Sequence, residues 1–175
     1  TISGPTAGAA TGTYRAGEAS FGPPLANGGA SGQVGVVAEQ TAGAGEGCEV
    51  FTRANALQVN GKIALLKRGV CGFAIKVKNA QNAGAIGVLV QDNVAENAAQ
   101  PSGLGGTDPT ITIPAVRIFL ADGDKIRAAL STRSRSASGV FASIGIVVQQ
   151  FAGADALGRM QMYAPNPFQG GSSVS

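Results

Sequence analysis

The segment from Gly61 to Val90 constrains the fold of this chain more than any other segment. It starts with a continuous apolar run, Ile63–Leu66, which is typical of a strand buried on both faces. A turn that contains a cysteine follows, and then a predicted helix over Ala74–Ala83 and a second predicted strand over Ala85–Val90. A strand, a helix and a strand within about thirty residues predict a parallel β-α-β unit. The turn after the first strand of such a unit commonly places binding groups.

The helix of this unit is predicted by the spacing of its small and apolar residues. Phe73, Val77, Ala80 and Gly84 recur at a helical period and form one face. The polar residues fall largely elsewhere: Lys76, Lys78, Asn79 and Asn82. Gly84 allows the helix to end and the chain to turn back. A purely structural interpretation, a helix packed on a sheet, explains Phe73 and Val77 better than Arg68, which ends a strand without an evident packing role.

Further elements are predicted before and after this unit. Three strands, one helical turn and one helix are expected: Gln33–Ala38, Thr112–Phe119 and Val140–Val148 as strands, Arg53–Leu57 as the turn, and Leu120–Leu130 as the helix. Pro114 inside the second of these strands indicates a strand start or a sheet edge. The polar segment Asn93–Pro109 is long for a connection in a compact domain, so it is either a functional loop or a surface excursion.

The two ends of the chain differ from its middle. Residues 1–32 have no steady apolar period, which predicts an irregular lead-in with one strand around Thr13–Ser20 and leaves open whether it packs on the core. Residues 33–150 are expected to form the main domain. Residues 151–175 contain several Pro, Gly and Ser residues and are expected to be an extended C-terminal segment or linker. Because the sequence begins without a methionine or a leader, we interpret it as a processed piece of a longer protein.

The absence of histidine excludes several classes of active site. The 175 residues suffice for one compact domain with a sizeable core, but none of them is a histidine. A Ser-His-Asp or Cys-His pair needs an imidazole base, and catalytic zinc sites are usually built on histidines. Asp122 and Asp124 lie where a helix is predicted to start, which favours a capping role over metal binding or acid-base catalysis. The sequence therefore predicts no catalytic set, no metal site and no cofactor.

The sequence predicts neither nucleic-acid binding nor a membrane span. The formal net charge is only +3, and a nucleic-acid binder would show a denser basic stripe with aromatic stacking partners. Arg133 and Arg135 lie among serines, and five basic residues surround the turn: Lys62, Lys67, Arg68, Lys76 and Lys78. A solvated basic surface is the favoured interpretation of these residues. No apolar run approaches the ~20 residues that a membrane span needs.

The two cysteines, Cys48 and Cys71, allow two interpretations. Cys71 could be a nucleophile at a helix N-terminus, a position that lowers the pKa of a thiol. Without a histidine, and with a second cysteine in the chain, a disulfide between the two is favoured, in a secreted or extracellular setting where it would persist. Such a bond would close a loop of about 24 residues and would stabilise the fold by roughly 3 kcal/mol in the chain-entropy account.

Several short motifs together resemble the protease-associated (PA) domain family. The first strand of the unit matches in Gly61–Leu65, and the turn after it matches in the pattern Arg68-Gly69-x-Cys71-x-Phe73. The following helix with its exit, and then the later strand and helix, match at these positions: Lys76, Lys78–Gln81, Ala83–Gly84–Ala85, Ile113–Val116 and Asp122–Gly123. Each match is weak by itself, but their order and spacing make the set specific. The resemblance covers about Gln33–Val148, and the tail Tyr163–Pro167 resembles a connection found after this domain in secreted bacterial proteins.

The resemblance implies a mixed α/β fold with a β-sandwich or open-barrel core, flanking helices and the β-α-β unit. Members of the family are non-catalytic inserts or neighbours of secreted proteases, and they form the lumenal part of plant vacuolar sorting receptors. In receptor members the loop that matches Arg68–Phe73 contacts the cargo peptide, and paired cysteines match Cys48 and Cys71. This chain departs from the receptor motif at Val70, where those receptors carry an acid.

Three hypotheses about function follow. The leading hypothesis is a non-catalytic module that binds a peptide or protein segment through the turn: Arg68, Gly69, Val70, Gly72 and Phe73. The Arg68 guanidinium would meet a carboxylate or carbonyl group, and the amides at the helix start would favour the same negative charge. The alternative is a structural domain that docks on the catalytic domain of its own parent protein. The third hypothesis, an enzyme that uses carboxylates, has no evident catalytic set to support it.

Overall fold

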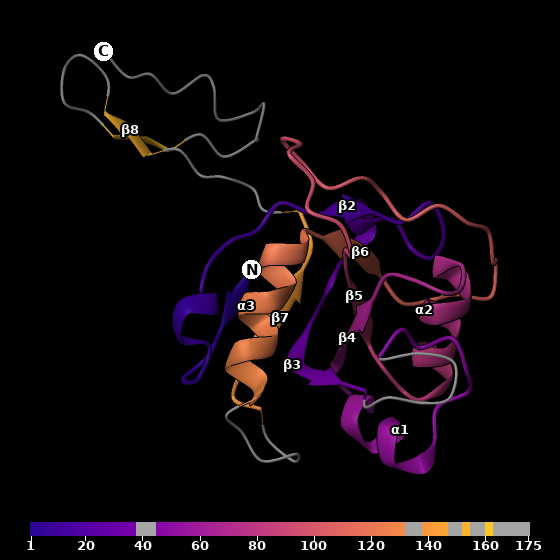
Figure 1. The fold of residues 1–175 in the computed structure, drawn as a ribbon. Helices are drawn as coiled ribbons and strands as arrows, with labels where there is room; N and C mark the ends of the chain where they lie inside the picture. Colours follow the sequence, from indigo (N-terminus) through magenta and orange to yellow (C-terminus); the bar gives the residue numbers. More distant parts are fainter. Residues whose placement is uncertain (38–44, 132–137, 147–151, 155–159, 163–175) are drawn as a thin grey trace.

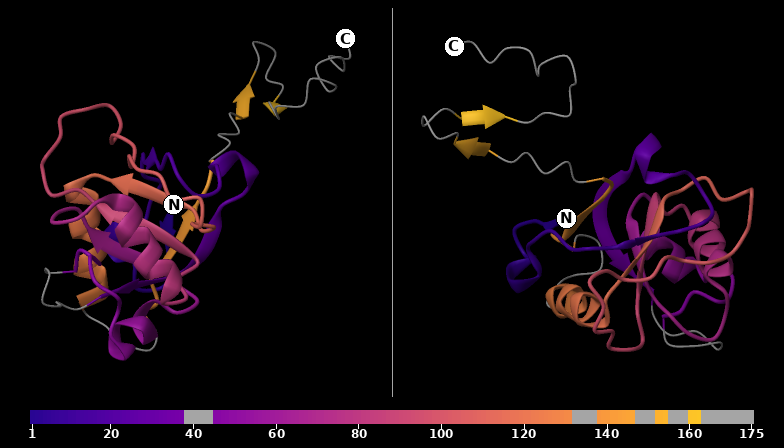
Figure 2. Two further views of the ribbon diagram at one scale, coloured as in Figure 1. Left: turned by 90° about the vertical axis from the view of Figure 1, so that its right-hand side faces the viewer. Right: turned by 90° about the horizontal axis from the view of Figure 1, so that it is seen from above.

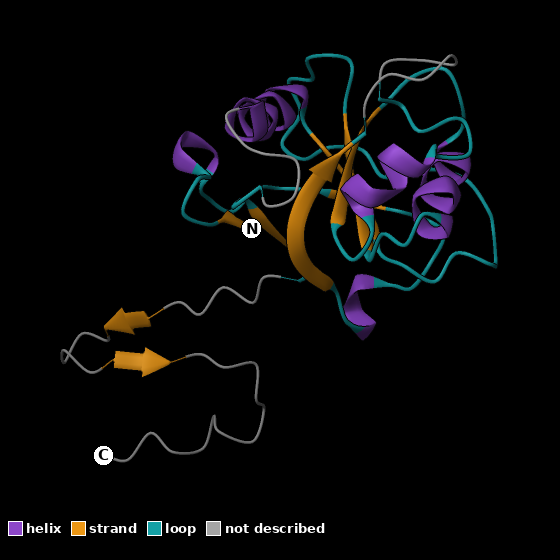
Figure 3. Cartoon of the chain, turned by 90° about the horizontal axis from the view of Figure 1, so that it is seen from below, coloured by secondary structure: helices purple, strands orange, loops and turns teal. Residues whose placement is uncertain are grey.

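One curled sheet of seven strands organises the computed structural model of this chain, which describes residues 1–37, 45–131, 138–146, 152–154 and 160–162. The strand order is β1-β7-β3-β4-β5-β6-β2. The strands are β1 (Ile2–Ser3), β2 (Gly17–Glu18), β3 (Ala30–Val36), β4 (Ile63–Lys67), β5 (Gly87–Gln91), β6 (Ala115–Ile118) and β7 (Phe141–Ile144). The sheet bends into an open half-barrel with helices on its two sides (Figure 3).

The helices flank this sheet. They are α1 (Arg53–Val59), α2 (Phe73–Asn82) and α3 (Leu120–Ser131), with two short 3-10 helices, η1 (Gly8–Ala10) and η2 (Leu25–Asn27). Figure 1 shows α1 and α2 on one side of the central strands and α3 on the other. Two further strands, β8 (Ala152–Ala154) and β9 (Met160–Met162), pair only with each other and form a second sheet (Figure 2). None of the helices in the described residues is long and apolar enough to cross a membrane.

The centre of the sheet is parallel. Strands β3, β4, β5 and β6 run side by side in one direction, so β4, α2 and β5 form the predicted β-α-β unit. β3 changes partner along its length: residues 30–33 pair antiparallel with β7, and residues 34–36 pair parallel with β4. The edges are the two-residue strands β1 and β2, which pair antiparallel with β7 and β6. Edge strands this short expose few unpaired backbone groups.

Both faces of the sheet are covered by hydrophobic cores. Along β4, Ala64 and Leu66 face the α2-side core, while Ile63 and Leu65 face the α3-side core, as the two-residue period of a strand requires. The main members of the α2-side core are Phe21, Val37, Phe51, Val59, Ala64, Leu66, Val77, Ala80, Val88, Val90, Leu104 and Ile111. Those of the α3-side core are Ile2, Val34, Ile63, Leu65, Leu89, Val116, Ile118, Ile126, Val140, Ala142 and Ile144. The apolar run in β4 is therefore buried on both faces, as predicted.

The expected fold class is confirmed in its open-barrel form, and several element boundaries move. The helical turn expected over Arg53–Leu57 is the longer helix α1, and only Gly17–Glu18 of the strand expected around Thr13–Ser20 pairs in the sheet. The strand expected over Thr112–Phe119 begins at Ala115, after Pro114, which fits the missing N–H of proline. Arg133, Arg135, Val147, Val148 and Tyr163–Ser175 lie outside the described residues, as do residues 38–44.

The lead-in supplies side chains to both cores. Ile2, Ala7 and Ala10 are buried in the α3-side core, and Phe21 is buried in the α2-side core. The backbone of Ser20 bonds to Leu104, which anchors the middle of the long segment Asn93–Pro109 at the same place. These contacts join segments far apart in the sequence, so no local period could reveal them.

Removing a side chain from the buried centre of β4 should destabilise the whole domain. Leu65 is fully buried, and Leu65→Ala should lower the free energy of unfolding by about 2–5 kcal/mol, because apolar burial is lost and a cavity remains. Urea unfolding followed by circular dichroism measures the change. Leu57→Ala is the matched control, since Leu57 is 63% exposed on α1. Equal losses in the two variants would contradict the assignment of the core.

Candidate functional site

The turn that joins β4 to α2 has an unusual backbone. Gly69 has φ 136°, and Val70 has φ 60°, the only described residue other than glycine with a positive φ. The Cys71 N–H donates to the Gly69 carbonyl at 2.7 Å, so Val70 is the centre of a three-residue turn. A β-branched residue in this region is strained, and such strain persists only where the surroundings enforce it. The side chain of Val70 is 77% exposed, so the turn presents it to solvent.

A disulfide between Cys48 and Cys71 holds the turn, as the sequence predicted. Their Cα atoms are 5.8 Å apart. Both cysteines of the chain are in this bond, so the interpretation of Cys71 as a free nucleophile is wrong. The bond joins the turn to the segment Gly45–Cys48. That segment is also held by backbone contacts, because the Lys67 N–H donates to the Gly45 carbonyl at 2.9 Å.

The sequence suggested that Lys76 belongs to a solvated basic surface, and this interpretation is wrong. Its side chain is fully buried, and its Nζ donates to the Glu46 carbonyl at 2.8 Å. The same Nζ lies 3.4 Å from Cys48 Sγ. Burial lowers the pKa of Lys76 to about 8, although the nearby Glu46 carboxylate opposes the change. Periodicity missed this residue because a buried lysine is rare and its partners come from a distant loop.

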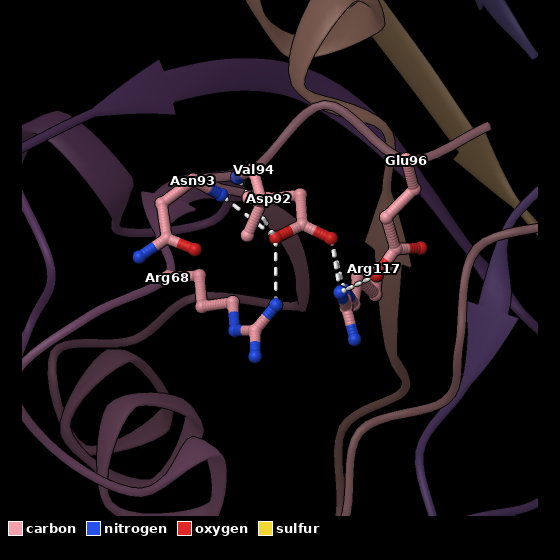
Figure 4. A network of polar contacts seen from close by, with 6 residues as sticks. All are labelled: Arg68, Asp92, Asn93, Val94, Glu96 and Arg117. Carbon is pink, nitrogen blue, oxygen red and sulfur yellow. Dashed lines mark hydrogen bonds and ion pairs between the residues drawn. The ribbon is translucent and has the colours of Figure 1, made fainter.

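Arg68 has a partner that the sequence did not reveal. Its Nη1 donates to Asp92 Oδ1 at 2.9 Å, and its side chain remains 35% exposed. Asp92 is fully buried, and its other oxygen, Oδ2, accepts two hydrogen bonds from Arg117, one of them from Nε at 2.7 Å. Arg117 Nη2 also reaches Glu96 Oε1 at 2.6 Å (Figure 4). The expectation that Arg68 ends its strand without a packing role is therefore corrected.

Strand geometry explains why these charges meet. Arg68, Asp92 and Arg117 belong to neighbouring parallel strands or directly follow them, near their carboxyl ends. Each lies two positions after a residue of the α2-side core, namely Leu66, Val90 and Ala115, so all three face the same side. Arg117 could have been recognised from the sequence as a charged residue inside a short apolar run, because a buried charge needs a partner.

The network fixes the ionisation of Asp92. Burial by itself would raise the pKa of this carboxyl group, but hydrogen bonds from Arg68, Arg117 and the Asn93 N–H outweigh it and hold the pKa below its ordinary value. The backbone N–H groups of Asn93 and Val94 both donate to Asp92 Oδ1, at 2.8 and 3.3 Å. Asp92 thus links the turn, the β6 strand and the start of the long segment after β5.

The structure places the predicted binding residues unequally. Val70 and Gly72 are exposed, Arg68 and Gly69 are half-buried, and Phe73 packs against the α2-side core. Gly72 is the N-cap of α2 and provides no side-chain cap, so the first-turn amides of this helix face the turn. Val94, which follows Asp92 by two residues, is 51% exposed. The turn therefore combines one half-exposed guanidinium with exposed apolar side chains.

The carboxylates of α3 have structural partners. Asp122 lies in the first turn of α3, as expected for an acid near the positive end of a helix, and it contacts Lys125 at 3.4 Å. Asp124 accepts a hydrogen bond from Gln91 Nε2 at 2.7 Å and so ties α3 to β5. Within the described residues, no group of three or more Cys, Asp or Glu side chains is placed to hold a metal ion.

A cavity lies away from the turn, on the α3 side of the sheet. Its volume is about 510 Å³, and its lining includes Leu89, Val116, Ile118, Ile126 and Ile144. None of the binding residues predicted from the sequence lines it. Its lining includes Ile2 of the edge strand β1, Val116 and Ile118 of β6, and Ile126 of α3.

Comparisons with known proteins match this architecture. The family model described as PA domain matches residues 24–126. The chain is 40% identical over 86 residues to ER degradation-enhancing alpha-mannosidase-like protein 3 of Xenopus laevis, covering 46% of this chain and 9% of that protein. It is 37% identical over 89 residues to vacuolar-sorting receptor 5 of Arabidopsis thaliana, covering 48% and 14%. It is 35% identical over 72 residues to the minor extracellular protease Vpr of Bacillus subtilis, covering 41% and 8%.

A solved structure shares the fold. The zinc aminopeptidase BSAP of Bacillus subtilis superposes with a TM-score of 0.53 at 23% identity, covering 82% of this chain and 29% of the aminopeptidase chain. The chain thus spans only 8–14% of the length of the three curated relatives and under a third of this structure.

Replacing Asp92 should lower the free energy of unfolding more than replacing Arg68. Asp92→Asn leaves the buried guanidinium of Arg117 without its main counter-charge and should lower the free energy of unfolding by about 3–5 kcal/mol. Arg68→Ala should cost much less, because Asp92 keeps Arg117. Urea unfolding of both variants measures the difference. A larger loss for Arg68→Ala would show that Asp92 is not the centre of the network.

Lys76 should make stability depend on pH in the alkaline range. Its folded pKa, about 8, lies below the ordinary value of 10.5, so the unfolded state binds more protons between these pH values. The stability of the wild-type protein should therefore rise with pH in this window relative to Lys76→Met, by at most about 1.4 kcal/mol per pH unit. Urea titrations below pH 8 and inside the window measure this slope, with Lys78→Met as the control. A constant difference between wild type and Lys76→Met would contradict it.

Proposed function

The chain belongs to the PA domain family, and from this premise we propose that it is a non-catalytic module that binds an extended peptide or protein segment at the turn Arg68–Phe73. The observation that best supports the proposal is the position of Arg68. A fully buried carboxylate, Asp92, holds Nη1 of its guanidinium, while 35% of the side chain stays exposed beside the turn. An arginine that is oriented in advance loses less conformational entropy when it binds a ligand.

The chemistry of the turn indicates the kind of ligand. The guanidinium keeps further N–H donors that suit a carboxylate or a carbonyl oxygen. The first-turn amides of α2 favour the same negative charge, since that helix has no side-chain cap. The Cys71 N–H is already bonded to Gly69, so it is not part of this anion site. Exposed Val70 and Val94 would contact apolar side chains of the ligand. We therefore propose an extended segment with a carboxylate next to apolar residues.

We propose that the parent protein is secreted. A disulfide is stable in an oxidising compartment, and this chain uses both of its cysteines for one. The similarity to an extracellular protease of Bacillus subtilis supports the same setting. The bacterial origin suggested by the sequence stays a prediction.

A second candidate function is docking on a catalytic neighbour in the same parent protein. The observation in its favour is that the chain matches only a small part of larger proteins. It covers 29% of the aminopeptidase chain and 8% of the extracellular protease. In this case the turn would contact the neighbouring domain and would meet no free peptide.

Calorimetric titration with a library of extended peptides tests the first proposal. Arg68→Ala should weaken the binding of carboxylate-containing peptides roughly tenfold or more, the loss expected for a charge-assisted hydrogen bond. Arg53→Ala is the matched control, because Arg53 is exposed on α1. Unfolding curves of both variants confirm that the fold is kept.

The outcomes separate the two candidates. Binding that Arg68→Ala leaves unchanged would contradict the role of the turn. If no peptide binds, but Arg68→Ala alters the activity or domain association of the full-length parent protein, the docking function replaces the peptide-binding function.

A further inference from the structure

The buried ammonium group of Lys76 is placed beside one sulfur of the disulfide. Lys76 Nζ lies 3.4 Å from Cys48 Sγ, within reach of a charge-assisted contact. Because the pKa of Lys76 is about 8, the amine still carries its proton at neutral pH. A positive charge at this distance stabilises a thiolate and lowers the pKa of the thiol. The two sulfurs therefore have different surroundings: Cys48 Sγ has a cation beside it, whereas Cys71 lies between two exposed residues of the turn.

The loop of Cys48 is held by contacts that do not depend on the disulfide. Lys76 Nζ donates to the Glu46 carbonyl at 2.8 Å, and Asn79 Nδ2 donates to the Gly47 carbonyl at 3.0 Å. Both side chains come from α2, which is packed on the sheet through Val77 and Ala80. These contacts would keep Cys48 next to Lys76 after the disulfide opens, so the favourable charge pair would persist in the reduced protein.

The turn of Cys71 differs from this loop. Both cysteines are half-buried, but the neighbours of Cys71, Val70 and Gly72, are exposed, whereas the neighbours of Cys48, Gly47 and Glu49, are half-buried. Val70, with its positive φ, directly precedes Cys71 in this turn. The exposed neighbours of Cys71 and the cation beside Cys48 Sγ both favour attack at Cys71, with Cys48 as the leaving group.

We propose that Cys48–Cys71 is a reducible thiol-disulfide exchange site, at which a dithiol reductant attacks Cys71 and Lys76 stabilises Cys48 as the leaving thiolate. A thiolate of the dithiol forms a bond with Cys71 Sγ while the bond between Cys71 and Cys48 breaks, and Cys48 takes the electron pair. The second thiol of the reductant, once deprotonated, attacks its own sulfur in the mixed disulfide and releases Cys71, which takes up a proton. The protein disulfide gains two electrons in all, and the dithiol becomes a cyclic disulfide.

The other polar neighbours of Cys48 oppose the thiolate and limit the effect. Glu46 carries a carboxylate close enough to raise the pKa of Lys76, and the Gly69 carbonyl oxygen lies 3.8 Å from Cys48 Sγ. Within the described residues, Lys76 is the cation in direct contact with Cys48 Sγ. The exchange site rests on these contacts alone and does not require that the turn binds a peptide.

The rate of disulfide reduction by dithiothreitol at pH 7, measured on the full chain, tests the proposal. Lys76→Met should lower the rate constant for reduction about threefold or more, because a leaving thiol whose pKa is about one unit higher departs more slowly. Lys76→Arg should keep most of the wild-type constant because the positive charge remains. Lys78→Met is the matched control on the same helix, since Lys78 Nζ donates instead to the Thr110 carbonyl. Equal constants for wild type and Lys76→Met would overturn the proposal, as would an equal decrease in Lys78→Met.

A second measurement applies even if Lys76→Met does not fold. In Cys71→Ser the Cys48 thiol is free beside an intact Lys76, and ultraviolet absorbance of the thiolate reports its pKa. We expect a pKa clearly below the ordinary value of about 8.5. A value at or above the ordinary one would show that Lys76 does not stabilise the thiolate and would overturn the proposal.

Discussion

The buried carboxylate of Asp92 is the interaction on which the carboxyl edge of the sheet depends. It accepts hydrogen bonds from Arg117 of β6, from Arg68 after β4 and from the backbone at the start of the long segment after β5. A single carboxylate thus fixes three segments that parallel pairing alone would leave free at their ends. A buried ion pair of this kind contributes little net stability compared with apolar residues, but it defines which groups meet. Here it defines the direction in which Arg68 points.

A second buried charge, Lys76, holds the other side of the same turn. Asp92 keeps its charge because cations surround it, and its pKa is lowered. Lys76 has a carbonyl, a sulfur and one nearby carboxylate, which compensate its burial only in part, and its pKa falls to about 8. Two charges of opposite sign are therefore buried in different ways: Asp92 joins strand ends to one another, and Lys76 joins α2 to the loop of Cys48.

The sequence predicts the elements whose signals are local. The apolar run Ile63–Leu66, the helical spacing of Val77 and Ala80 and the cysteine pair were sufficient for the β-α-β unit and its disulfide. The charged partners were not predicted, because Asp92 and Arg117 meet only through the register of β5 and β6. The helical period also misassigned Lys76, since a lysine counts as polar wherever its side chain lies. Local patterns describe how a chain folds into elements, whereas the site arises where those elements meet.

The disulfide and the Asp92 hydrogen bond hold different atoms of the turn. A change in the disulfide therefore need not disturb the group that we propose binds the ligand carboxylate. The disulfide holds Cys71 and the strained backbone at Val70, while the hydrogen bond to Asp92 holds the guanidinium of Arg68. Opening the disulfide removes only the first constraint, because the Asp92 network contains no sulfur. The backbone at Val70 could then relax while Arg68 stays oriented by a carboxylate that remains buried and ionised. Under the two proposals together, reduction would change the apolar part of the binding surface and leave its charged part in place.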